Sequence, residues 1–304
     1  MRASILFSIF LYSAIAAFGQ GPFSTDEALQ QLYRNFDPKS KTARWLCTKE
    51  QQTTGMHAGW PCSNEDSIVS VAVILVAQVP EGDTTRVYLA TSAKPAQDPM
   101  GYDCHACAPA IGAAVFVWRD DHWGLESENP AVGFYGGWGE PSNVNLVQVG
   151  PQKHGLLLSS DDEGQGFSSS WKSLLIPLGK TVSEVWTIED ENDNLGAVDP
   201  TDKLNPEMPY RASAAFRFDV FDEKHLADTG YYDIEVISRG KDKEDYGHPF
   251  KSENWTEIYR FGGIKYQLLQ RKSFVEVTKA KGARRGRHEH ANSRFTSSAP
   301  GSAP

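Results

Sequence analysis

The run Ala113-Ala114-Val115-Phe116-Val117-Trp118, followed by Arg119-Asp120-Asp121-His122 and then Trp123-Gly124-Leu125-Glu126, has the pattern of a β-hairpin. Two segments rich in β-branched and aromatic residues flank a polar turn, and such residues favour strands because they pack well on a pleated surface. The pattern occurs six times in succession. The paired runs are 67–79 with 85–91, 113–118 with 123–126, 144–149 with 156–159, 172–178 with 183–188, 212–220 with 231–238, and 258–261 with 264–269.

These successive hairpins set the expected fold class. No helical stretch separates the strands, which excludes parallel βαβ units and requires antiparallel pairing. The sequence therefore predicts an all-β fold, an antiparallel hairpin meander that forms a sandwich, a barrel or propeller-like blades. No strict internal motif repeat selects among these three arrangements.

One helix is expected before the strands. Ser24, followed three residues later by Glu27, has the spacing of a capping box. Apolar residues on one helical face then predict a helix from about Thr25 to Phe36, ended by Asp37-Pro38. The chain from there to Asn64 is polar and is expected to be irregular.

The N-terminus has the features of a secretory signal. Arg2 precedes an apolar run, Ile5 to Ala17, and Ala17-Phe18-Gly19 forms a small-x-small cleavage site before Gln20. This run is shorter than the ~20 residues of a membrane-spanning helix, and no later stretch approaches that length. We therefore expect a secreted or periplasmic protein with no transmembrane segment after signal removal; an uncleaved anchor is the alternative.

Composition divides the chain into four segments. They are a signal peptide (1–19), an N-terminal helix with an irregular disulfide-containing segment (20–66), a β-rich domain (67–278) and a basic tail (279–304). The tail has few apolar residues and is expected to be disordered, because it cannot bury enough surface to offset its chain entropy.

Charge is unevenly distributed along the chain. The net charge is −9, yet the tail holds six Lys or Arg residues against Glu289, so the body is strongly acidic. An acidic body argues against nucleic acid as its partner. The basic tail alone has the charge to contact an anionic surface.

The four cysteines are expected to form disulfides, because an oxidising compartment lets thiols pair. Three pairings are open to four cysteines. Closeness in sequence favours Cys47 with Cys62 and Cys104 with Cys107.

The run Cys104-His105-Ala106-Cys107 also admits two other interpretations. Two thiolates and an imidazole, at Cys104, His105 and Cys107, are ligands suited to zinc or copper. A Cys-x-x-Cys pair can instead be redox active. A structural disulfide is the favoured interpretation, since coil precedes the pair and a β-like run follows it.

A partial calcium motif lies further along the chain. Asp190, Asn192 and Asn194 place oxygen ligands at alternate positions, but the glycine falls one position late and the twelfth residue is Thr201. An acidic, solvated connection between strands is the alternative.

Aromatic residues near glycines and acids are the candidate ligand-binding residues. Such side chains provide flat platforms for a small molecule, glycan or protein, and neighbouring carboxylates accept hydrogen bonds. Covering the ends of a β core is the alternative role. The candidates are Phe134, Tyr135, Trp138, Phe167 and Trp171.

Catalytic motifs are not found. The sequence has no Gly-x-Ser-x-Gly and no His-Glu-x-x-His, and scattered carboxylates are uninformative without geometry. We therefore assign no catalytic residue.

Several short motifs together resemble a loose group of secreted bacterial proteins with no assigned activity. The resemblance covers roughly residues 65 to 270 and implies compartment and fold class only. The last motif also resembles the strand endings of some propeller repeats. The motifs are Cys104-His105-Ala106-Cys107-Ala108-Pro109, Gly137-Trp138-Gly139, 147–158, Tyr232-Asp233-Ile234 and Tyr259-Arg260-Phe261-Gly262-Gly263.

The predicted function is that of a secreted or periplasmic β-rich binding or structural protein, stabilised by disulfides. The alternative is a metal-binding or redox protein centred on Cys104-His105-Ala106-Cys107.

Overall fold

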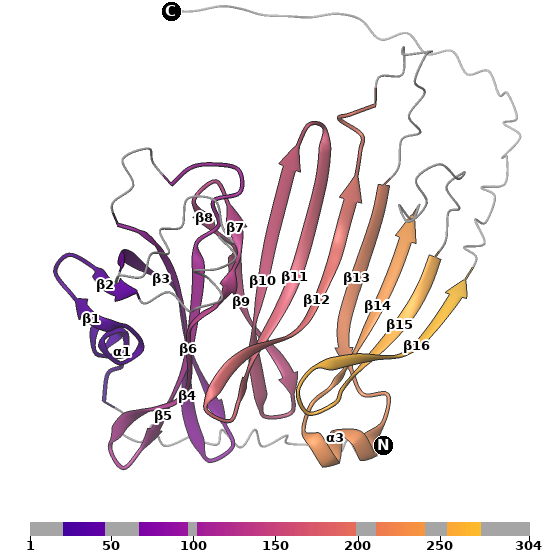
Figure 1. Cartoon of the computed structure of the whole chain (residues 1–304). Coiled ribbons are helices and arrows are strands. Elements are labelled where there is room, and N and C mark those ends of the chain that lie inside the picture. Colours follow the sequence, from indigo (N-terminus) through magenta and orange to yellow (C-terminus); the bar gives the residue numbers. More distant parts are fainter. Residues whose placement is uncertain (1–20, 46–66, 97–101, 199–210, 241–253, 275–304) are drawn as a thin grey trace, which may run out of the picture. The chain divides into compact units, whose positions relative to one another are not determined.

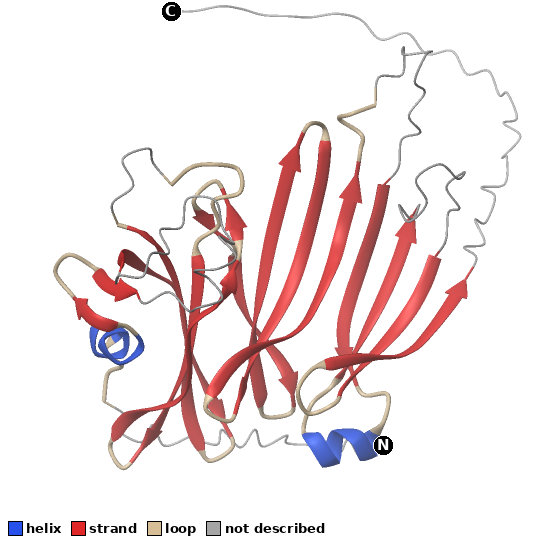
Figure 2. Cartoon of the chain, in the orientation of Figure 1, coloured by secondary structure: helices blue, strands red, loops and turns tan. Residues whose placement is uncertain are grey.

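The computed structural model describes residues 21–45, 67–96, 102–198, 211–240 and 254–274. Over these residues the chain is all-β, as predicted, with strands forming nearly all of its regular structure (Figure 1, Figure 2). The predicted signal peptide, the expected Cys47–Cys62 bridge and the basic tail lie outside the described residues. Among the described residues, no helix is long and apolar enough to cross a membrane.

The N-terminal helix begins where its capping box predicts and ends earlier. Helix α1 spans Thr25–Leu32, and the Ser24 hydroxyl accepts a hydrogen bond from the Glu27 amide. Tyr33 is already extended, and the next residues form strand β1 (Arg34–Asp37), which pairs with β2 (Thr42–Trp45). The predicted end at Phe36 was therefore wrong. The Tyr33 hydroxyl lies 2.7 Å from the Thr91 hydroxyl, a tertiary contact at the end of the helix. The spacing of apolar residues along the helix carries no information about such a contact.

The remaining long strands form three consecutive four-stranded antiparallel meanders. The first meander is β3 (Ser67–Glu81), β4 (Thr84–Pro95), β5 (Ala110–Arg119) and β6 (His122–Phe134). The second is β9 (Asn143–Gly150), β10 (Lys153–Gly164), β11 (Phe167–Leu178) and β12 (Thr181–Asp193). The third is β13 (Arg211–Asp219), β14 (Asp233–Gly240), β15 (Asn254–Phe261) and β16 (Tyr266–Phe274).

Short elements and limited pairings connect these meanders. Strands β7 (Gly136–Gly137) and β8 (Glu140–Pro141) form a separate small hairpin between the first and second meanders, whereas α3 (Glu223–Thr229) joins β13 to β14 within the third. Strand β12 pairs in parallel with β6 through Thr181 and Glu128, and antiparallel with β13 through three residue pairs. Within the described ranges the sheet does not close, because β1, β9 and β16 each pair with a single strand.

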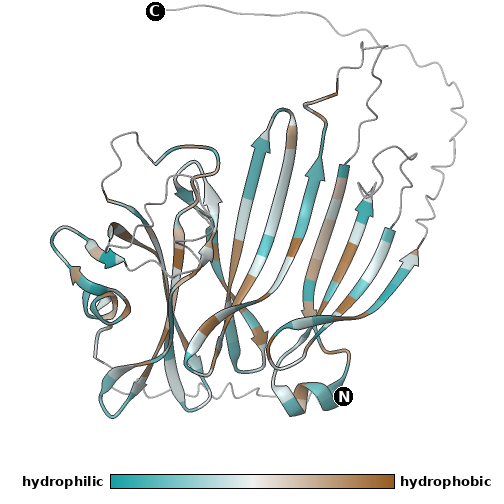
Figure 3. Cartoon of the chain, in the orientation of Figure 1, coloured by the Kyte–Doolittle hydropathy of each residue, from teal (hydrophilic) through white to brown (hydrophobic). Residues whose placement is uncertain are grey.

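Three hydrophobic clusters hold the layers together. The first joins α1 to the first meander, the second joins the first and second meanders, and the third joins the second and third. Along β11, Leu175 belongs to the second cluster while its neighbours Leu174 and Ile176 belong to the third, as expected for side chains that alternate across a strand. Figure 3 shows apolar residues of the second meander in the lower half of its strands and hydrophilic residues towards the upper ends of β10 and β12. Of the three predicted arrangements, four-stranded meanders stacked face to face correspond to propeller-like blades.

All six predicted hairpins are present, and several strands are longer than predicted. Strand β10 continues through Asp161 and Asp162 to Gly164, and β12 continues through Asp190 to Asp193. These polar residues disfavour strands by propensity. Apart from Asp190, which lies at a register shift, they are nevertheless opposite residues of β11, so ladder pairing determines the strand ends.

Candidate ligand-binding site

Cys104 and Cys107 are joined in a disulfide, as their spacing predicted, with Cα atoms 5.0 Å apart. The Cys107 amide donates to the Cys104 carbonyl oxygen (2.8 Å), which closes a tight turn, here termed the cysteine loop (Cys104-His105-Ala106-Cys107). Cys104 is exposed, whereas Cys107 is buried. In this bonded state the two sulfurs present no thiolate to a soft metal.

The glycine-rich segment 136–139 receives the cysteine loop. The Gly139 amide donates to the Cys107 carbonyl oxygen (2.7 Å), and the Trp138 amide donates to that of His105 (3.4 Å). Gly139 has a φ of +73°, and a Cβ at this position would lie 1.7 Å from the Tyr102 carbonyl oxygen. Only glycine allows so close an approach of the two backbones. The cysteine loop is thus fixed by its own bridge and by the chain beneath it.

A cavity of about 400 Å³ lies where the cysteine loop and the first meander meet the second meander. We term it the inter-sheet cavity. Its lining combines aromatic rings, hydroxyls, carboxylates and one imidazole. The lining residues are His105, Ala106, Phe134, Tyr135, Gly136, Ser160, Asp161, Asp162, Trp171, Ser173, Glu184 and Thr187.

This cavity forms because the side chains on the inner face of the second meander change from apolar to mainly polar at the same height on three neighbouring strands. Along β10, Leu156 and Leu158 belong to the second cluster, and the next residue on that face is Ser160. Along β11, Leu175 is followed on the same face by Ser173 and then Trp171. The same change, from an apolar to a polar residue, separates Val182 from Glu184 on β12. Three adjacent strands therefore stop contributing to the core together.

Hydrogen bonds fix the polar side chains of the cavity. The Tyr135 hydroxyl donates to Glu184 Oε2 (2.7 Å), across from the first meander to the second. Burial, followed by the neighbouring Glu184 carboxylate, raises the pKa of Tyr135 well above its ordinary value. Tyr135 therefore remains a neutral hydrogen-bonding group in the site.

His105 connects the cysteine loop to β10. Its Nε2 lies 2.6 Å from Asp162 Oδ1 and 3.1 Å from the Glu163 carbonyl oxygen. The ring also packs edge-on against Trp138, with centroids 5.2 Å apart. The disulfide thus positions a side chain that lines the cavity.

The structure brings three of the five candidate aromatic residues together. Phe134, Tyr135 and Trp171 line the inter-sheet cavity. Trp138 is 59% exposed beside His105, and Phe167, which is 37% exposed, begins β11 after the turn that follows β10. Neither of these two belongs to the lining.

Sequence reasoning missed the residues of the second meander that complete the cavity. Ser160, Ser173, Glu184 and Thr187 are separated by up to 27 positions and belong to no motif. The available signal was the alternation along 156–160, 171–175 and 182–187, in which apolar residues give way to polar ones. It becomes informative only after the three strands are aligned.

The calcium candidates lie in and just after strand β12. Asp190 accepts a hydrogen bond from the Ser170 hydroxyl (2.7 Å) and lies 3.2 Å from the Lys172 ammonium. Asn192 donates to Glu189 Oε1 (2.6 Å), and Asn194 follows the strand end in a buried position. In the part of the chain that the structure describes, no three His, Cys, Asp or Glu side chains come together as metal ligands.

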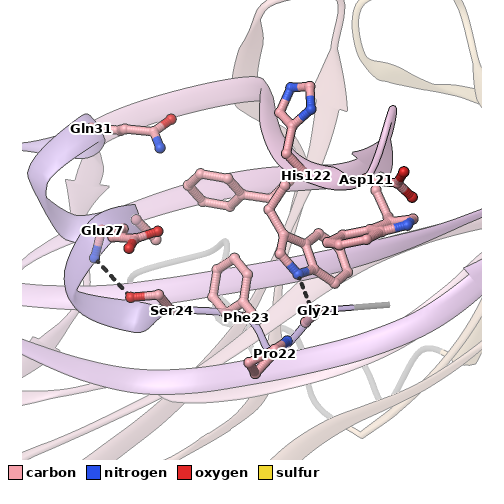
Figure 4. Close-up of a pocket in the computed structure, with 12 residues that line it drawn as sticks. Gly21, Pro22, Phe23, Ser24, Glu27, Gln31, Asp121 and His122 are labelled. Carbon is pink, nitrogen blue, oxygen red and sulfur yellow. Dashed lines mark hydrogen bonds between the residues drawn. The ribbon is translucent and has the colours of Figure 1, made fainter. Parts of the chain in front are cut away.

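A second cavity, of about 250 Å³, lies beside the start of α1 (Figure 4). Phe23 packs against the rings of Phe116 and Trp123, at centroid distances of 5.2 and 5.5 Å, and Trp123 Nε1 donates to the Gly21 carbonyl oxygen (3.0 Å). Glu27 is among the polar residues that line it. None of the five candidate aromatic residues lines this cavity, so the inter-sheet cavity is the candidate site.

No protein-family model, curated protein or solved structure matches this chain.

Proposed function

We propose that this chain is an exported carbohydrate-binding protein and that the inter-sheet cavity holds the sugar. The observation that carries the proposal is the simultaneous change of β10, β11 and β12 from core residues to hydroxyl, aromatic and carboxyl side chains. Such a change sacrifices apolar burial at several positions, which a purely structural sheet has no reason to do.

The chemistry of the lining suits a sugar ring. Sugars present apolar C–H faces and hydroxyl edges, so their sites combine aromatic rings with a few placed polar groups. Trp171 and Tyr135 supply rings, and Ser173 and Thr187 supply hydroxyls, whose oxygens lie 3.1 Å apart. The volume of about 400 Å³ falls in the range typical of small-molecule sites.

Rigidity of the walls also supports binding, because a site that is already ordered loses little entropy when its ligand arrives. The Tyr135–Glu184 hydrogen bond joins the two sides of the cavity. The cysteine loop is fixed by its disulfide and by Gly139.

The proposal is tested by titration calorimetry with a panel of mono- to tetrasaccharides. Trp171→Ala is expected to weaken binding about tenfold or more, since loss of an aromatic contact typically costs 1–3 kcal/mol. Trp255→Ala is the matched control, because Trp255 lies on β15, where its ring contacts Arg271 at 5.4 Å. Absence of binding across the panel, or equal loss in both variants, would contradict the proposal.

Export is supported by the signal-like N-terminus and by the Cys104–Cys107 disulfide, which persists in oxidising compartments. Expression of the full chain followed by N-terminal sequencing of the exported product is expected to give Gln20 as the first residue. An unprocessed, intracellular chain would refute this part of the proposal.

A further inference from the structure

We infer that the inter-sheet cavity selects a cationic sugar, one that carries a free amino group, over neutral and acidic sugars. This inference rests on the proposed carbohydrate function and adds the class of substrate. It follows from the charges that surround the cavity.

Carboxylates dominate the charged groups of the lining. The carboxylates of Asp162 and Glu184 face the cavity, whereas the side chain of Asp161, between Ser160 and Asp162 on β10, points to the opposite face of the strand. Among the described lining residues, the His105 imidazole is the only side chain that can carry a positive charge. Even when His105 is protonated, one positive charge faces two negative ones. The lining contains no lysine or arginine in the residues that the structure describes.

Lys94 and Lys172, which bond or neighbour residues around the cavity, are engaged elsewhere. Lys94 donates to the Gly139 carbonyl oxygen (2.9 Å) behind the glycine-rich segment and lies 3.8 Å from Glu140. Lys172 sits between Trp171 and Ser173 on β11, so its side chain points to the opposite face of the strand, where it lies 3.2 Å from Asp190. Neither ammonium group neutralises the cavity.

Both carboxylates that face the cavity already have one polar partner. Asp162 Oδ1 lies 2.6 Å from His105 Nε2, and Glu184 Oε2 accepts a hydrogen bond from the Tyr135 hydroxyl. The second oxygens of Asp162 and Glu184 have remaining acceptor capacity, since a carboxylate offers about four lone-pair sites.

An ammonium group on a sugar ring meets these requirements best. It donates charge-assisted hydrogen bonds to carboxylates, while the ring stacks on Trp171 or Tyr135 and its hydroxyls reach Ser173 and Thr187. A neutral or N-acetylated sugar forfeits the charged contacts. An acidic sugar is repelled by the same carboxylates.

The test compares four probes on the full-length oxidised protein by calorimetry: glucosamine trisaccharide, its N-acetylated counterpart, a neutral glucose trisaccharide, and spermidine. We expect the glucosamine trisaccharide to bind about tenfold more tightly than the N-acetylated one at low salt. That preference should decrease as salt screens the charges.

One substitution assigns the preference to the cavity. Glu184→Gln should reduce the ratio of the glucosamine affinity to the N-acetylated affinity several-fold, since the amide keeps an acceptor oxygen but loses the negative charge. Asp120→Asn is the matched control: it removes one charge from an exposed turn between β5 and β6, where the φ of +51° suits asparagine. Circular dichroism verifies that each variant is folded.

The outcomes separate this inference from the proposed function. Equal binding of the charged and neutral sugars would overturn the charge selection and leave carbohydrate binding in place. Spermidine binding as tightly as the glucosamine trisaccharide, or no saccharide binding at all, would overturn both.

Discussion

His154 Nδ1 lies 2.6 Å from Glu81 Oε1, so a side chain of the second meander reaches a carboxylate buried in the first. The side chain of Glu81 is only 4% exposed, and it also accepts hydrogen bonds from Tyr88 and Arg86, each at 2.9 Å. Arg86 is held in turn by Glu126 (2.7 Å). This buried polar network complements the second hydrophobic cluster in joining the two meanders.

Replacement of Glu81 by glutamine should destabilise the protein. Because the amide is a weaker acceptor and directs an N–H at one of its former donors, we expect a loss of about 1–3 kcal/mol in the free energy of unfolding, measured by urea titration. Glu140→Gln, at a side chain that is 79% exposed, is the control and should change it by less than about 0.5 kcal/mol. Equal stability of the two variants would show that the network contributes nothing.

Two glycines separate the effect of a steric clash from that of backbone conformation. Gly139→Ala places a Cβ 1.7 Å from the Tyr102 carbonyl oxygen at a φ of +73°, whereas Gly179→Ala has a φ of +64° and no atom within 4 Å. The Gly179 variant should lose about 1 kcal/mol, the cost of the left-handed conformation. The Gly139 variant should lose clearly more and should also weaken sugar binding. Similar thermal midpoints for both would contradict this view of the cysteine loop.

Removal of the Cys104–Cys107 bridge should affect binding as well as stability. The bridge closes a very short loop, so the loop-entropy model gives a loss of only about 2 kcal/mol for a double Cys→Ser variant. Without the bridge, His105 is no longer held at the cavity. We therefore expect reduction of the native protein to weaken sugar binding. The double variant, treated with the same reductant, is the control and should show no further change. If reduction lowers affinity equally in both, the bridge is not the cause.

Alkaline pH should destabilise the fold through its tyrosines. Burial, assisted by the negative charge of Glu81, raises the pKa of Tyr231 from its ordinary 10.0 to about 12, and burial also raises the pKa of Tyr33 and Tyr266. Such a phenol binds its proton more tightly in the folded state. Its contribution to stability is therefore complete below about pH 10 and is lost as the pH rises towards 12.

Urea titrations at several pH values above about 9, read beside the tyrosinate absorbance, measure this loss. Tyr231→Phe should make the pH dependence shallower. Titration of all tyrosines near pH 10 in a chain that remains folded would contradict the expectation.

Local patterns were sufficient to predict the hairpins and the Cys104–Cys107 bridge, because partners close in sequence are specified by turn residues and spacing. The end of α1 at Leu32 and the contact of β12 with β6 depend on residues tens of positions away, so periodicity could not locate them. For the same reason, only some residues of the candidate site could be predicted. Tyr135 and Trp171 stand out as aromatics, whereas Glu184 is an ordinary acidic residue until β12 is placed beside β11.

Strand β11 has apolar clusters on both sides, and this has a consequence for how the sequence can vary. Leu174 belongs to the third hydrophobic cluster and Leu175 to the second, so neither face of this part of the strand accepts a polar replacement. Strand β16, where most residues face solvent, should accept many replacements. A saturation mutagenesis survey would therefore find the least tolerant residues in the middle of the chain's layered sheets, with tolerance increasing towards the outermost strand.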